Sequence, residues 1–409
     1  METTVYELDN GLQVIYKYIP YTKTVHCGYV INAGSRDDRD GEMGMAHFIE
    51  HMIFKGTEKR KNFHILNYLE SVGGDVNAYT TKEKTCLYAS MVSEYFERAT
   101  EFLTDITFHS IFPQKEIAKE KQVISEEIDL YRNMPDEAIF EDFDELIYPN
   151  HGLGHPILGT KDSIRSFTQD KVRTHLQRAF IQGQVVYSIV GNVPKKKVEK
   201  VIHKYLAPLE VPSGQKRLIS PNGINVFHKE QAITTDQAHV IFGTKAFPMR
   251  KSHYFPFLVL NNLLGGPSMN SKLSLNVREK YGLTYNISSF YTPYIDSGIW
   301  GIYYACEKGN MERIQKLVWK ELEKLKSQPL GAIRLSQAKK QLVGQMTLGY
   351  ENLLNQMLSM AKDLLDFRTV ISFDSYIEDI QQVNSSQILE AANEIFQRDE
   401  ISTIVYKAG

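Results

Sequence analysis

Apolar and polar positions alternate along the chain in short runs, which are separated by longer stretches of helical periodicity. Six runs in the first half are rich in β-branched and aromatic residues, which is typical of strands: residues 3–8, 12–19, 25–32, 76–79, 85–92 and 185–190. Between these runs, apolar residues recur every three or four positions, as they do on one face of a helix. The pattern therefore predicts a mixed α+β fold with long helices.

A segment without apolar periodicity divides the sequence. Residues 206–223, LAPLEVPSGQKRLISPNG, contain three prolines and two glycines, a composition typical of a linker. The order of elements then repeats, with predicted elements at residues 238–244 (strand), 253–266 (helix), 283–291 (strand) and 298–306 (strand). We therefore expect one domain at residues 1–205 and a degenerate repeat of it at residues 224–409.

Composition narrows the function classes. The 409 residues carry a formal net charge of −2. The chain therefore has no excess of positive charge that would attract a polyanion, and we expect no nucleic-acid partner. No apolar run approaches the ~18 residues that a membrane span requires, and no signal peptide is visible at the beginning. Three scattered cysteines suit a reducing compartment. We expect a cytoplasmic protein that does not enter a membrane, unless a leader has been removed.

The candidate chemistry lies in residues 41–56, GEMGMAHFIEHMIFKG. Here His47, Glu50 and His51 form a His-x-x-Glu-His set, the spacing of an inverzincin zinc site. At about 100° per residue of helix, the three side chains fall within an arc of ~100°. Two imidazoles can then reach one metal ion while the carboxylate points at a metal-bound water. The opposite face is apolar, as expected for a helix that packs against a core.

A catalytic zinc ion needs three protein ligands and an open position, whereas a structural one needs four, which are commonly cysteines. The cysteines show no Cys-x-x-Cys spacing, so we expect a carboxylate as the third ligand. The amphipathic helix predicted over residues 112–133 places Glu120 and Glu127 two turns apart on one face, with Glu126 about 100° away. A solvated helix face is the alternative interpretation of these glutamates.

The segment HFIEHMIFKGT, followed 76 positions after His51 by the second Glu of VISEE, resembles the pitrilysin (insulinase) family of metallopeptidases. The resemblance implies that His47, His51 and Glu127 bind one Zn²⁺ ion per chain. It also implies that Glu50 is the general base and that Glu120 supports the site. The fold it implies is α+β, with two homologous domains, each a mostly antiparallel sheet packed with long helices, of which one keeps the metal.

A peptide-binding strand is expected close to the motif. Within residues 71–90, two glycines precede Asn77, Ala78 and Tyr79 in an extended, alternating pattern. Such an edge strand can bind varied peptides through main-chain hydrogen bonds, although an ordinary hairpin with a glycine turn is the alternative. The family resemblance favours the substrate-binding strand. Phe54 indicates an apolar pocket beside the metal.

A second segment, NVREKYGLTY, carries Arg278 and Tyr285. These two residues resemble the Arg and Tyr that family members supply from their last domain to the substrate carbonyl and the transition state. In the large single-chain members four such domains enclose a chamber, whereas this chain has two. We therefore expect a dimer whose active sites combine both chains, most simply a homodimer, with a sister-subunit heterodimer as the other arrangement.

Three function classes follow. The first is a zinc endopeptidase that cleaves unfolded peptides or presequence-like segments inside a dimer chamber. The second is a non-catalytic or weakly active peptide-binding subunit of a heterodimeric peptidase, which the intact motif disfavours. The third is another inverted-motif metal enzyme of the S-ribosylhomocysteinase type, which uses a cysteine ligand that this chain does not offer at a comparable place. The sequence favours the peptidase.

Overall fold

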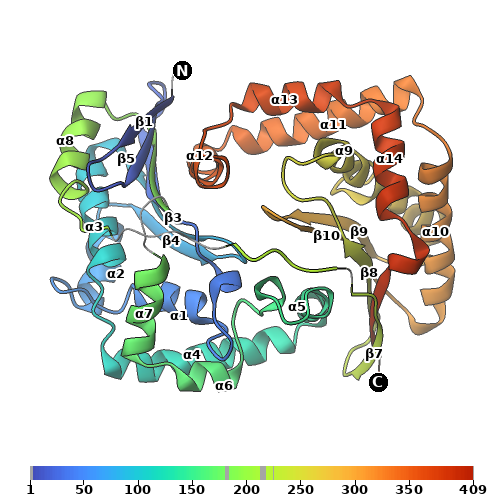
Figure 1. Cartoon of the computed structure of the whole chain (residues 1–409), viewed down its shortest axis with the longest axis horizontal. Coiled ribbons are helices and arrows are strands. Elements are labelled where there is room, and N and C mark those ends of the chain that lie inside the picture. Colours follow the sequence, from blue (N-terminus) through green and yellow to red (C-terminus); the bar gives the residue numbers. More distant parts are fainter. Residues whose placement is uncertain (1–2, 180–183, 212–217, 224, 409) are drawn as a thin grey trace. The chain divides into compact units, whose positions relative to one another are not determined.

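The computed structural model describes residues 3–179, 184–211, 218–223 and 225–408. They form two compact units, each built around its own β-sheet (Figure 1). The first unit comprises residues 1–129, 155–218 and 349–371, and the second comprises residues 130–154, 219–348 and 372–409. Each unit therefore draws on both halves of the sequence.

The first unit contains a six-stranded sheet with the order β1-β2-β6-β3-β5-β4. In this order the strands are Thr3–Glu7, Gln13–Tyr18, Val185–Gly191, Thr24–Ile31, Thr85–Val92 and Asp75–Thr80. All neighbours are antiparallel except β2 and β6, which are parallel. The six strands predicted from the sequence and the mostly antiparallel α+β class are confirmed.

Both faces of this sheet are covered. On β3, Cys27, Tyr29 and Ile31 belong to a core that includes helix α3, while Val30 points to the other face and packs with helix α12. Burial on both faces explains why β3 and β6 are almost continuously apolar. The helices of this unit are α1 (Met45–Met52), α2 (Asn62–Glu70), α3 (Phe96–Phe108), α4 (Gln114–Arg132), α6 (Lys161–Ser166), α7 (Gln169–Ala179), α8 (Lys195–Tyr205) and α12 (Leu353–Phe367).

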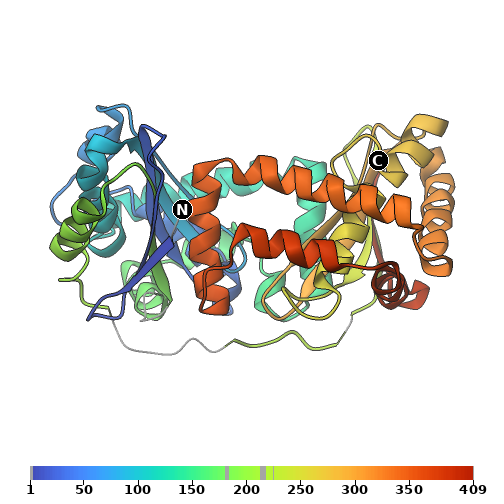
Figure 2. The same ribbon diagram turned by 90° about the horizontal axis from the view of Figure 1, so that it is seen from above.

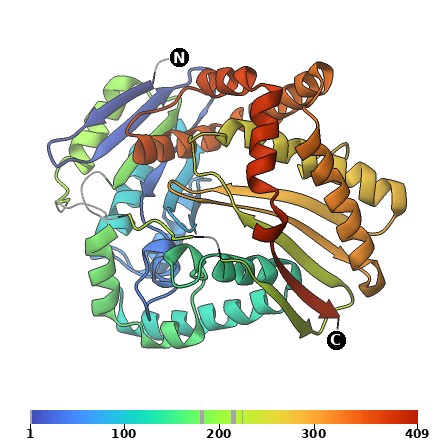
Figure 3. The ribbon, with the colours of Figure 1, turned by 45° about the vertical axis from the view of Figure 1, so that its right-hand side comes forward.

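The second unit contains a five-stranded sheet with the order β7-β11-β8-β10-β9 (Figure 3). These strands are His228–Ile233, Ser402–Ala408, Ala238–Lys245, Gly298–Cys306 and Asn286–Pro293. Helix α5 packs on one face, and α9, α10 and α14 pack on the other. The remaining helices have the bounds α5 (Pro135–Ile147), α9 (Tyr254–Gly265), α10 (Met311–Ser327), α11 (Ala332–Tyr350), α13 (Phe373–Gln382) and α14 (Ser385–Ile395).

The two sheets repeat one topology. The order β2-β6-β3-β5-β4 in the first unit corresponds to β7-β11-β8-β10-β9 in the second. The one parallel pair has the same place in both, because β2 pairs with β6 and β7 with β11. Helix α9 follows β8 as α1 follows β3. This correspondence supports the two homologous domains expected from the order of elements in the sequence.

The compact units do not coincide with the two halves of the sequence. Helix α5 lies before the predicted linker but packs on the second sheet, and α12 lies after it but packs on the first sheet (Figure 2). Each follows a long helix, α4 or α11. The domain boundary at residues 206–223 stays a prediction, and residues 212–217 of that segment lie outside the described part. Among the described residues, no helix is long and apolar enough to span a bilayer.

Candidate metal centre

Helix α1 carries the His-x-x-Glu-His set, and a buried carboxylate fixes its beginning. One oxygen of Asp38 accepts hydrogen bonds from the backbone N–H groups of Gly44 at 2.8 Å and Met45 at 3.1 Å, and the other accepts from Ala46 at 3.1 Å. These donors have no partner inside the helix. Gly44 has φ 89°, and a Cβ there would lie 2.6 Å from the carbonyl oxygen of Leu158, so this turn requires glycine.

The faces of α1 agree with the sequence pattern. The apolar residues Met45, Phe48 and Met52 are fully buried in the core of the first unit. His47 is 8% exposed, while Glu50 and His51 are partly exposed on the other face. The core contact therefore orients the helix so that the three polar side chains remain available.

Glu127, on helix α4, lies beside the two histidines. One ligand atom from each of His47, His51 and Glu127 lies within 4.8 Å of the other two, and this is the one such group of His, Cys, Asp or Glu in the described ranges. His51 Nε2 and Glu127 Oε2 are 3.7 Å apart. Zinc bonds of about 2.0–2.2 Å place neighbouring ligand atoms roughly 3.4 Å apart, so the two nitrogens and the carboxylate oxygen fit a zinc ion after small side-chain rotations.

Glu120 holds the orientation of His51. It is buried, and its Oε1 lies 2.9 Å from His51 Nδ1, while its Oε2 lies 2.8 Å from Lys55 Nζ. Burial raises the pKa of Glu120, but the hydrogen bonds from His51 and Lys55 outweigh it, so its pKa lies below the ordinary value. A carboxylate on Nδ1 leaves Nε2 for the metal, an arrangement typical of metal-ligating histidines.

His47 stays neutral. Burial, together with the nearby charge of His51, lowers the pKa of His47 to about 3. Its Nδ1 atom is buried without a hydrogen-bond partner among the described residues. A neutral imidazole can bind a metal ion without first losing a proton, so His47 suits the metal site.

Glu50 lies next to the two histidines and is held by a residue that the sequence analysis did not single out. Thr80, at the end of β4, donates a hydrogen bond from its hydroxyl to Glu50 Oε2 at 2.6 Å. Burial raises the pKa of Glu50, and the Thr80 hydrogen bond is the largest effect that opposes this rise. Strand alternation places Thr80 on the same face as Ala78, and this signal could have identified it.

Glu126 does not take part in the cluster. Its carboxylate accepts a hydrogen bond from the exposed Gln122 amide at 3.1 Å. For this residue the alternative of a solvated helix face holds.

Strand β4 forms the edge of the first sheet, as the peptide-binding expectation requires. A pocket of about 330 Å³ lies along it. Phe54, Asn77 and Ala78 line this pocket, but Tyr79 does not; its side chain lies on the opposite face, beside Tyr88. The backbone N–H of Ala78 bonds to Asn77 Oδ1 at 2.8 Å, so this donor is not used by the ladder to β5.

The pocket is lined by both apolar and charged residues. Its lining residues are Glu50, His51, Phe54, Lys55, Ile65, Leu66, Glu70, Val76, Asn77, Ala78, Phe102 and Glu120. We call this cavity the β4 pocket.

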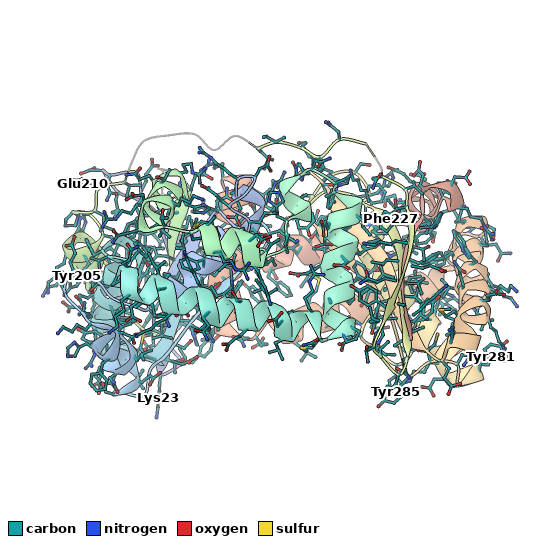
Figure 4. The ribbon with its side chains drawn as sticks, turned by 90° about the horizontal axis from the view of Figure 1, so that it is seen from below. Lys23, Tyr205, Glu210, Phe227, Tyr281 and Tyr285 are labelled. Carbon is teal, nitrogen blue, oxygen red and sulfur yellow. The ribbon has the colours of Figure 1, made fainter. Side chains whose placement is uncertain are left out.

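Arg278 and Tyr285 lie together in the second unit. Arg278 belongs to a π-helical segment, Ser274–Glu279, and its guanidinium carbon lies 5.2 Å from the centre of the Tyr285 ring. Tyr285 is 81% exposed and projects from the surface of its unit (Figure 4). The two residues are therefore neighbours, and they are available to a partner.

Comparisons with known proteins identify the family of the chain. Residues 13–161 match the model of the insulinase family (peptidase family M16), and residues 166–342 match the M16 inactive domain. A Bacillus subtilis (strain 168) protein named as an uncharacterized zinc protease is 32% identical over 99% of this chain and 98% of its own length. The β subunit of the Saccharomyces cerevisiae mitochondrial-processing peptidase is 27% identical over 98% of this chain and 90% of its own.

Solved structures share the fold. A protease from Helicobacter pylori superposes with a TM-score of 0.92 at 20% identity and covers 99% of both chains. An M16 inactive-domain structure from Pseudomonas fluorescens gives a TM-score of 0.90 at 19% identity, with 99% of this chain and 98% of the other covered.

Proposed function

The chain belongs to the insulinase family of peptidases (M16), and from this premise we propose that it is a zinc-dependent endopeptidase that cleaves unfolded peptides or presequence-like segments. The observation that carries the proposal is the convergence of His47, His51 and Glu127 beside the carboxylate of Glu50. Two nitrogens and one oxygen leave a coordination position for water, as in catalytic zinc sites.

The residues of the cluster have different roles in this proposal. His47, His51 and Glu127 would hold the metal, and Glu120 would keep His51 in the metal-binding orientation. Bound there, zinc would polarise the scissile carbonyl and lower the pKa of a coordinated water toward ~7. Glu50 accepts the proton of the attacking water and passes it to the leaving amine.

We also propose that Arg278 and Tyr285 stabilise the oxyanion of a substrate bound to another chain. Their mutual contact and the exposure of Tyr285 support this role. The active species would then be a homodimer whose chamber combines both chains, or a heterodimer with a sister subunit. The relative named as a mitochondrial-processing peptidase β subunit supports the heterodimer as the alternative.

A cytoplasmic location is part of the same proposal. It is supported by the three cysteines, Cys27, Cys86 and Cys306, which are all buried and free and suit a reducing compartment.

The test combines zinc analysis with cleavage of a quenched fluorescent peptide, with and without a chelator. The native protein should contain one zinc ion per chain, and the chelator should stop cleavage. Glu50→Gln should keep the metal and lose turnover, whereas His47→Ala should lose both. Zinc-independent cleavage, or wild-type activity of Glu50→Gln, would overturn the proposal; bound zinc and peptide without cleavage would favour the non-catalytic subunit.

A further inference from the structure

One carboxylate of the β4 pocket has no hydrogen bond or ion pair with another side chain in the described part of the chain. Lys55 pairs with Glu120 at 2.8 Å, and Glu50 accepts the hydroxyl of Thr80. Glu70, at the end of α2, makes no side-chain hydrogen bond or ion pair within the described ranges. The negative charge at the exposed side of the pocket is therefore uncompensated.

Part of the pocket lining offers apolar surface to the stem of a side chain. Phe54, Ile65 and Val76 offer aromatic and aliphatic surface, and Ile65 is fully buried. Glu70 itself is exposed. A side chain that enters this pocket can bury its methylene groups while its end stays hydrated beside Glu70, which is how lysine and arginine lie at apolar surfaces.

We propose that Glu70 is a specificity-determining residue, which makes the β4 pocket prefer a lysine or arginine side chain of the substrate. This inference rests on the proposed peptidase function. Without Glu70, the other two carboxylates of the pocket are already bonded to Lys55 and Thr80, so a cation that enters loses water and gains no partner of its own. With Glu70, the same cation gains an ion pair, so the preference between a charged and an uncharged stem of equal length depends on this one carboxylate.

The position of the pocket along β4 indicates which substrate residue enters it. The chain direction of β4 runs from Val76 and Ala78, which line the pocket, to Thr80, which holds Glu50. A peptide that pairs antiparallel with this edge strand runs the opposite way. If its scissile carbonyl lies at Glu50, the residue that follows the cleaved bond lies at the pocket.

The test uses quenched peptides that differ only in the residue after the cleaved bond: lysine, norleucine or glutamate. Norleucine has the methylene stem of lysine without the amine. Because ion pairs near the surface are worth little, we expect kcat/KM to be only about 1.5- to fivefold higher for lysine than for norleucine. The lysine preference should decrease as ionic strength rises, since salt screens exposed charges.

Glu70→Gln should reduce the lysine-to-norleucine ratio to about one, and Glu70→Leu should invert it. The zinc content and the far-UV circular dichroism spectrum of both variants should match those of the wild type, which shows that they fold. Glu58 is an exposed carboxylate that does not line the pocket. Glu58→Gln is therefore the matched control, and it should keep the wild-type lysine-to-norleucine ratio. A second series that varies the residue before the bond should not depend on Glu70.

The outcomes separate the subsite from the peptidase function. A wild-type preference for norleucine, or an unchanged ratio in Glu70→Gln, overturns the role of Glu70 while chelator-sensitive cleavage of the norleucine peptide continues. Absence of chelator-sensitive cleavage for every peptide overturns the peptidase function, and the subsite with it.

Discussion

Replacing Thr80 with valine tests how Glu50 is kept ready to act as a base. The change keeps the shape of the side chain and removes the hydroxyl that donates to Glu50 Oε2 at 2.6 Å. Burial already raises the pKa of Glu50, and the Thr80 hydrogen bond is the strongest effect that lowers it. Without the hydroxyl, the pKa of Glu50 should rise further.

The size of the effect follows from the charge on the acceptor. A hydrogen bond to an ionised group is worth about 1.5–3 kcal/mol, and one pKa unit corresponds to about 1.4 kcal/mol. The pKa of Glu50 should therefore rise by about one to two units. Glu50 accepts a proton only when it is ionised, so the acid limb of the kcat/KM profile should move to higher pH by the same amount, and the loss of activity should be largest at low pH.

The assay measures kcat/KM for one quenched peptide from about pH 5 to 9, with zinc content determined on the same samples. Thr80→Val should keep the metal, because within the described part of the chain the Thr80 hydroxyl bonds to Glu50 and to none of the three proposed ligands. Thr80→Ser retains a hydroxyl and should keep the wild-type profile. An acid limb that stays in place in Thr80→Val, or one that moves to lower pH, would refute the reasoning about Glu50.

The remaining predictions concern folding and assembly. Lys84→Met leaves Asp366 buried without its partner at 2.6 Å, so the free energy of unfolding should fall by about 3 kcal/mol, measured by urea denaturation; no change would contradict the pairing. Asp38→Ala removes the cap of α1, so the free energy of unfolding should fall by about 1–2 kcal/mol. Zinc binding, measured by competition with a chelator, should also weaken, and an unchanged zinc affinity would show that α1 does not need the cap. Mixing Glu50→Gln with Tyr285→Phe chains should restore about a quarter of wild-type activity if each site combines two chains, and no recovery would argue for sites within one chain.

Most of the candidate metal cluster could be proposed from the sequence because its spacing is local. A helix places His47, Glu50 and His51 on one face wherever the helix lies in the fold. The third member of the cluster is on α4, and periodicity left both Glu120 and Glu127 as candidates there. The structure brings both to His51, one on each imidazole nitrogen, and periodicity could not tell these two positions apart.

Two strands were not predicted, for different reasons. Strand β7, with the sequence HKEQAI, is an exposed edge strand, so it lacks the alternation that marks a half-buried strand. Strand β11, STIVYKA, lies inside the second sheet, and its β-branched run was a usable signal. An edge strand with polar side chains is recognised only once its neighbour is known.

The sequence pattern could not predict which sheet α5 and α12 cover. Because of their placement, the compact units differ from the two halves of the sequence. Periodicity shows that a helix has an apolar face but not which sheet that face covers. On the first sheet, Val30, Val186 and Val190 are covered by Met357 and Ala361 of α12. The segment that contains the metal motif therefore depends for one of its two cores on residues beyond the predicted linker, and a chain that ended at residue 205 would expose that face. The repeat is thus visible in the order of the strands, whereas the unit that carries the candidate metal site includes residues from both copies.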